Sequence, residues 1–133
     1  MSPRARAASS RRDDRKVHEP GELDSALKAV VDDILAVYDA EKVILYGSAA
    51  EGRPWHDLDL LVIAETSDRF PERLKKVALA KSYWTPADIL VLTPDELDEA
   101  VAENRYFIVE EVLKKGTTVY DRPGSKRLDP VRS

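Results

Sequence analysis

Apolar and polar positions along the chain change period several times, and each period predicts an element. Between residues 22 and 38, apolar side chains recur every three or four positions, which predicts an amphipathic helix. Short apolar runs at 42–46, 58–64 and 87–92 predict three strands. The run at 58–64 is apolar at nearly every position, as expected for a strand packed on both faces. Helical spacing returns from residue 70 to about residue 82.

The C-terminal half of the chain carries signals for two further helices and a strand. The segment TPDE at 93–96 predicts a helix start, with a threonine cap and a glutamate that closes the capping box. A second helix is predicted from about residue 103 to residue 115, ended by Gly116, and a short edge strand follows at 117–120. This order of elements predicts a single α+β (α/β) domain, in which a small mixed β-sheet is flanked by helices.

We expect three regions along the chain. Residues 1–20 lack hydrophobic periodicity and are rich in Arg, Ser and Ala, which predicts a disordered basic tail. Residues 21–121 form the folded domain, and residues 122–133, with two prolines and a glycine, form a flexible tail. The composition of the first tail also resembles an organelle transit peptide, but Asp13 and Asp14 argue against that interpretation.

Charge is divided unevenly among these regions. The net charge is −4, yet residues 1–20 carry six Lys/Arg and three Asp/Glu, and residues 122–133 carry four and one. Subtraction from the totals of 21 and 25 leaves 11 basic and 21 acidic residues in 21–121, a net charge of −10. Such an acidic domain disfavours a nucleic-acid partner except through the basic tails. The chain has no cysteine, which excludes disulfides and cysteine-based metal sites, and no apolar stretch approaches a membrane span, so we expect a cytoplasmic protein.

Two aspartates at the start of the second strand are the most informative polar residues. Asp57 and Asp59 flank Leu58, and because successive side chains of a strand alternate, both carboxylates point the same way. Like charges on one side of a buried strand repel each other unless a cation lies between them. Oxygen ligands at this spacing suit a hard divalent ion, most simply Mg²⁺.

A third carboxylate and a Gly–Ser pair complete a candidate site. Asp88 opens the third strand, and if the second and third strands are neighbours, it lies beside Asp57 and Asp59. Three carboxylates at one sheet edge could hold two Mg²⁺ ions, and Asp88 could accept a proton from an acceptor hydroxyl. Gly47 would let the backbone approach a phosphate, and Ser48 would offer an N–H and a hydroxyl at the start of a predicted helical turn.

These motifs resemble a known family. The string YGSAAEGRPWHDLDLLVI at 46–63, with the separate aspartate of ADILVL at 87–92, resembles the nucleotidyltransferases of the DNA polymerase β superfamily. It is most similar to their small bacterial and archaeal group, the minimal nucleotidyltransferases or MNT proteins. The resemblance covers about residues 22–121 and implies a polymerase β-like nucleotidyltransferase fold. It also implies metal-binding and catalytic roles for Asp57, Asp59 and Asp88.

The resemblance extends to the loop between the Gly–Ser pair and the aspartates. Gly47 and Ser48 match the phosphate-binding pair, and Gly52 matches the glycine after the short helical turn. The loop AAEGRPWH has eight residues where the family usually has ten, and Glu51 stands where a basic residue is frequent. Arg53 follows closely and is a candidate triphosphate contact. His56, which has no second histidine or cysteine nearby, is not expected to bind metal.

The family implies a transferase that uses ATP as its substrate. It moves a nucleoside monophosphate, usually AMP, to an acceptor hydroxyl and releases pyrophosphate. Many MNT proteins are antitoxins whose partner is a helical HEPN-domain toxin, and some silence it by adenylylating a tyrosine. We therefore expect a Mg²⁺-dependent nucleotidyltransferase that acts as a type VII-like antitoxin on a HEPN toxin, as a homo- or hetero-oligomer.

Other functions stay open from the sequence. The short loop and Glu51 are compatible with an inactive MNT-fold antitoxin that neutralises its partner by contact alone. Related enzymes modify small molecules of the aminoglycoside type, and glycosyltransferases also use DxD motifs with a metal, although these usually need a larger domain. The sequence does not decide whether Trp55 and Trp84 have core, base-stacking or partner-facing roles. Tyr106 and Phe107 lie on a helical stripe, which favours core packing or a partner interface over chemistry.

Overall fold

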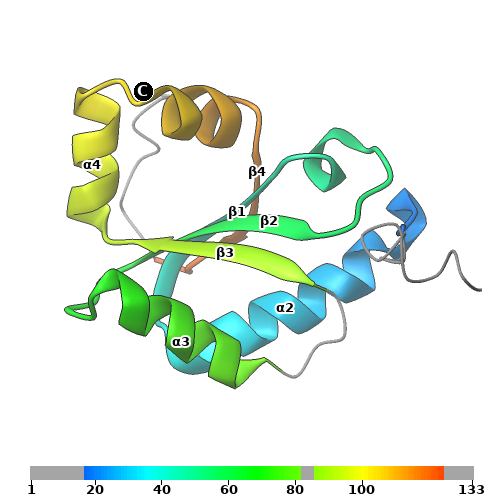
Figure 1. Cartoon of the computed structure of the whole chain (residues 1–133), viewed down its shortest axis with the longest axis horizontal. Helices are drawn as coiled ribbons and strands as arrows, with labels where there is room; N and C mark the ends of the chain where they lie inside the picture. Colours follow the sequence, from blue (N-terminus) through cyan, green and yellow to red (C-terminus); the bar gives the residue numbers. More distant parts are fainter. Residues whose placement is uncertain (1–16, 82–85, 125–133) are drawn as a thin grey trace, which may run out of the picture.

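Four strands form one mixed sheet, in the order β3-β2-β1-β4, in a computed structural model that describes residues 17–81 and 86–124 (Figure 1). Their bounds are β1 (Ala40–Tyr46), β2 (Leu58–Ala64), β3 (Ala87–Leu92) and β4 (Thr117–Asp121). β1 pairs antiparallel with β2 and with β4, whereas β2 and β3 run parallel. The predicted mixed sheet flanked by helices is therefore confirmed.

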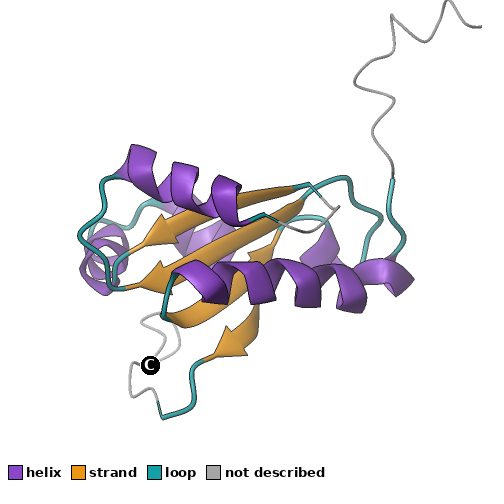
Figure 2. Ribbon diagram, turned by 90° about the horizontal axis from the view of Figure 1, so that it is seen from below, coloured by secondary structure: helices purple, strands orange, loops and turns teal. Residues whose placement is uncertain are grey.

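Helices cover both faces of this sheet. Their bounds are η2 (Pro20–Glu22), α2 (Leu23–Val37), η3 (Ala49–Glu51), α3 (Phe70–Ala80), α4 (Pro94–Ala102) and η4 (Phe107–Lys114). α2 and α3 lie against one face, and α4 and η4 lie against the other (Figures 1 and 2). None of the helices in the described part of the chain combines the length and the apolar composition that a membrane-spanning segment needs.

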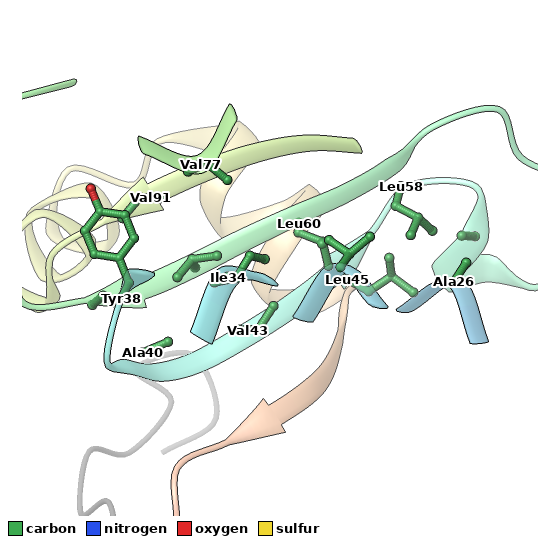
Figure 3. Close-up of a cluster of buried hydrophobic side chains, with 14 of the residues drawn as sticks. Ala26, Ile34, Tyr38, Ala40, Val43, Leu45, Leu58, Leu60, Val77 and Val91 are labelled. Atoms are coloured by element: carbon green, nitrogen blue, oxygen red, sulfur yellow. The ribbon is translucent and has the colours of Figure 1, made fainter. Parts of the chain in front are cut away.

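Each face of the sheet has its own hydrophobic core, and the side chains of β2 alternate between the two cores. Leu58, Leu60 and Val62 pack towards α2 and α3, where Figure 3 shows Leu60 among residues of α2 and β1. Leu61 and Ile63 pack towards α4 and η4. All five side chains are almost completely buried, which agrees with the prediction from the apolar run.

The last predicted helix begins later than its sequence pattern indicates. α4 continues to Ala102, and Asn104 then adopts a left-handed backbone conformation with φ of 53°. Asparagine tolerates that conformation but does not continue a helix in it, so η4 begins only at Phe107. η4 is a π-helix, a rare form in proteins.

The N-terminal boundary is also placed differently from the expectation. Residues 1–16 lie outside the described residues, but 17–20, expected to be disordered, belong to the fold. His18 is 1% exposed, and its backbone forms an isolated bridge with Trp55, with N···O distances of 2.7 and 3.0 Å. The imidazole stacks on the indole at a centroid distance of 4.4 Å. This contact anchors the segment before α2 to the loop that leads into β2.

Candidate functional site

Strand pairing brings the predicted acidic residues together at one end of the sheet. Asp59 of β2 pairs with Asp88 of β3 on one side and with Tyr46 of β1 on the other. β2 and β3 are therefore neighbours, which is the condition stated above for Asp88 to lie beside the aspartates of the second strand. Two positions further along, Leu61 and Leu90 belong to the core under α4 and η4. By strand alternation, Asp59 and Asp88 project from that same face.

The carboxylates influence one another electrostatically. Asp59 is partly buried, and its pKa is raised from 3.8 to about 6, first by desolvation and then by the charges of Asp88 and Asp57. The pKa of Tyr46 is raised to about 12 by burial and by Asp59 and Asp88. Both shifts have the same physical cause, since negative charge accumulates where water is partly excluded. A cation bound here would relieve that repulsion.

Gly47 lies directly against the central carboxylate. Its φ of 81° is in the left-handed region, and a Cβ placed on it would lie 2.5 Å from Asp59 Oδ2. A side chain at this position would therefore collide with the carboxylate and strain the backbone. The turn at Gly47 and the carboxylate of Asp59 are therefore in close contact. A phosphate held by the turn and a metal held by the carboxylate would be neighbours.

The η3 turn follows at once and is held by backbone hydrogen bonds. The carbonyl oxygen of Gly47 accepts from the N–H of Ala50 at 3.1 Å, and that of Ser48 accepts from the N–H of Arg53 at 3.1 Å. Ser48 occupies the cap position, but its side chain makes no capping hydrogen bond. Gly52, with φ of 76°, ends the turn, and a Cβ there would meet open space. The left-handed conformation therefore favours glycine at this position, with no steric reason beside it.

Arg53 and Glu51 pair with each other in the same loop. Arg53 Nη2 and Nε donate to Glu51 Oε1 at 2.7 and 3.0 Å, and both side chains are substantially exposed. The negative charge of Glu51 is thus offset by the positive charge of Arg53 in the same loop. An exposed pair of this kind is weak, so Arg53 can exchange Glu51 for a phosphate at little cost.

The donor set suits a hard divalent ion, although the side chains do not converge on one point. Asp57 and Asp59 are partly buried, and Asp88 is exposed. Within residues 17–81 and 86–124, no three Asp, Glu, His or Cys side chains are placed so that together they could hold a metal ion. Asp59 and Asp88 are neighbours on adjacent strands, and Asp57 lies just before β2.

Two aromatic residues of this region are not indicated as site residues by the sequence pattern. Tyr46 ends β1 and pairs with Asp59, and Phe107 begins η4. The two rings meet edge to face at a centroid distance of 5.5 Å. Trp55, left undecided by the sequence, is 2% exposed and belongs to the core, whereas Trp84 lies outside the described residues.

Comparison with models of known protein families found none that matches this chain, and comparison with curated proteins found no sequence match either.

Proposed function

We propose that this protein is a Mg²⁺-dependent nucleotidyltransferase of the MNT type, which transfers AMP from ATP to a hydroxyl group. The observation that carries the proposal is the pairing of Asp59 with Asp88, with the left-handed turn at Gly47 against Asp59. A phosphate-binding turn and clustered carboxylates at one end of a sheet are the parts that phosphoryl transfer needs.

The residues divide the chemistry among them. Asp57, Asp59 and Asp88 would hold the metal, which when bound would neutralise charge on the triphosphate. The backbone of Gly47 and Ser48 would hold the leaving pyrophosphate, with Gly52 fixing the turn and Arg53 available as an added cation. The acceptor oxygen attacks the α-phosphorus and gives its proton to Asp88, while the bond from that phosphorus to the β-phosphate oxygen breaks.

The partner proposed for this activity is a HEPN-domain toxin, with a tyrosine hydroxyl as acceptor. The described part of the chain has no second domain to enclose an acceptor, so the acceptor would dock across the open end of the sheet. Asp88 is exposed there, as a residue that meets a macromolecular acceptor must be.

The direct test incubates the protein with the product of its adjacent gene, α-labelled ATP and Mg²⁺. We expect label on the partner protein with the wild type and none with Asp88→Asn. Asp95→Asn, an exposed acidic residue in the first turn of α4, is the matched control and should leave labelling unchanged. If no label is transferred while Asp57→Ala still neutralises the partner, the enzymatic proposal is wrong.

A second candidate function is neutralisation of the partner by contact alone. Large apolar side chains are exposed on α3 and at the start of η4, at Phe70, Leu74, Leu79, Tyr106 and Phe107. The exposed apolar side chains on α3 and those at the start of η4 lie on opposite faces of the sheet, so each group is a separate candidate contact surface for a partner. Calorimetry with ATP and Mg²⁺ separates the two candidates, since a protein that acts by contact alone would bind no nucleotide.

A further inference from the structure

The aromatic pair beside the carboxylates is the starting observation. Tyr46 is partly buried and pairs with Asp59, and the ring of Phe107 meets the ring of Tyr46 at an interplanar angle of 83°. Phe107 is nevertheless 47% exposed. An edge-to-face contact uses one edge or one face of a ring, so Phe107 keeps aromatic surface open to solvent.

The strand order fixes the directions in which a bound nucleotide can extend. Gly47 follows β1, on one side of Asp59, and Asp88 lies in β3, on the other side. In an in-line displacement the leaving pyrophosphate and the attacking oxygen occupy opposite sides of the α-phosphorus. Under the proposed function, pyrophosphate therefore takes the β1 side and the acceptor takes the β3 side.

The nucleoside must then leave in a third direction, along the face of the sheet or into solvent. Asp59 projects from the face of the sheet that carries η4. An aromatic surface on this face is the pair formed by Tyr46 and Phe107. A cavity of about 410 Å³ lined by Leu90, Leu92 and Ile108 lies further towards β3, on the acceptor's side.

We infer that the base of the bound nucleotide stacks on the ring of Phe107. Tyr46 holds the Phe107 ring in place through their edge-to-face contact. This inference rests on the proposed function. Stacking on an aromatic ring tolerates any base, because every base has a π-face. Phe107 therefore contributes affinity for nucleotides in general, and the affinity for ATP and for GTP should fall together when its ring is removed.

The test compares two ligands that differ in the nucleoside. Titration calorimetry with Mg²⁺–ATP and with Mg²⁺–tripolyphosphate is carried out on the full chain and on Phe107→Ala. We expect the Kd for ATP to rise about fivefold or more, in line with the stacking contribution of one base, and the Kd for tripolyphosphate to stay unchanged. Phe107→Trp should retain ATP affinity, and Phe107→Leu, which keeps apolar bulk in η4, should lose it as the alanine variant does.

Tyr106→Ala is the matched control, because Tyr106 is 66% exposed just before η4 and its hydroxyl lies 3.4 Å from Glu111. It should change neither Kd. Three results would each overturn the inference. Phe107→Ala could weaken the binding of ATP and of tripolyphosphate equally, it could leave the Kd for ATP unchanged, or Tyr106→Ala could raise the Kd for ATP as much as Phe107→Ala does. If the wild type binds both ligands, Asp59→Asn binds neither and Phe107→Ala is unaffected, the inference fails while the proposed function stands. If the wild type binds neither ligand, both fail.

Discussion

Gly47 shows at the scale of one residue how the turn and the carboxylates depend on each other. Gly47 and Gly52 both have a positive φ, near 80°, so an alanine at either site incurs similar backbone strain, roughly 1 kcal/mol. Only at Gly47 does the added Cβ collide, at 2.5 Å from Asp59 Oδ2, whereas Gly52 faces open space.

Gly47→Ala is therefore expected to abolish binding of Mg²⁺–tripolyphosphate, while Gly52→Ala is expected to retain it with a small loss of stability. Calorimetry at matched fractions of folded protein measures the difference. Equal binding by the two variants would contradict a joint role of Gly47 and Asp59.

Asp59 gives the expected dependence of stability on pH in the absence of metal. Its pKa is 3.8 in the unfolded chain and about 6 in the fold, so between these values the folded state binds more protons. Its contribution to stability therefore falls as pH rises from 3.8 to about 6, and the full penalty is present above that range.

Asp59→Asn removes this penalty and should raise the free energy of unfolding at pH 7 by roughly 1 kcal/mol, a figure reduced for solvent screening of a partly exposed group. Below pH 3.8 the gain should vanish. Thermal unfolding across this range measures it, with Asp95→Asn as a control that should show no gain. A destabilised Asp59→Asn at pH 7 would contradict the penalty that burial and the charges of Asp88 and Asp57 are described as placing on this carboxylate.

At the scale of elements, hydrogen bonds from the Arg73 side chain connect α3 to β3 and α4. This side chain is almost completely buried and donates to Glu96 at 2.7 and 3.1 Å, to the carbonyl oxygen of Asp68 at 2.8 Å and to that of Val91 at 2.9 Å. Glu96 also accepts from the N–H of Thr93 at 2.8 Å, which confirms the capping box predicted from the sequence.

Replacing Arg73 by leucine should lower the free energy of unfolding by about 3 kcal/mol, because Glu96 and two backbone carbonyls lose a buried partner. Chemical denaturation measures this loss. Lys28→Ala breaks the exposed pair of Lys28 with Asp32 at 3.1 Å and should cost at most about 0.5 kcal/mol. Similar losses for the two variants would show that burial does not strengthen the Arg73 network.

The strands and most helices were predictable because their signals are local. The apolar run predicted β2, which begins at Leu58, so Asp57 lies just before the strand. Contacts between elements distant in the sequence were not predictable. Arg73 occupies a polar helical position typical of a solvated charge, but it is buried where α3 packs against β3 and where Glu96 of α4 reaches it. The start of η4 depends on the left-handed backbone at Asn104, which the apolar stripe does not indicate.

At the scale of the whole molecule, the N-terminal boundary of the fold lies earlier than composition indicates. Composition places 1–20 in a tail, yet the bridge of His18 with Trp55 holds 17–20 against the loop before β2. A chain that begins at Val17 should therefore unfold at a temperature several degrees higher than one that begins at Gly21, since about 1 kcal/mol corresponds to such a shift in a small domain. Calorimetric unfolding of both chains tests this, and coincident transitions would contradict it.

The acidic domain sets the electrostatic conditions for its proposed ligand. A net charge of −10 over residues 21–121 opposes a bare triphosphate, so a divalent ion must accompany it. Glu51 in the loop after β1 would repel a triphosphate, but Arg53 pairs with Glu51 at 2.7 Å and offsets its negative charge. Binding of the nucleotide should therefore depend on the metal more than on the cations of the loop.

The most direct test of the account is a calorimetric titration of ATP into the wild-type protein and into Asp59→Asn, each with and without Mg²⁺. We predict saturable binding by the wild type only when Mg²⁺ is present. We also predict a loss of at least about tenfold in affinity for Asp59→Asn, since a carboxylate that binds the metal would contribute on the order of 1.4 kcal/mol or more. Nucleotide binding that is independent of Mg²⁺, or an unchanged affinity in Asp59→Asn, would contradict the assignment of the carboxylate cluster as a metal and phosphate site.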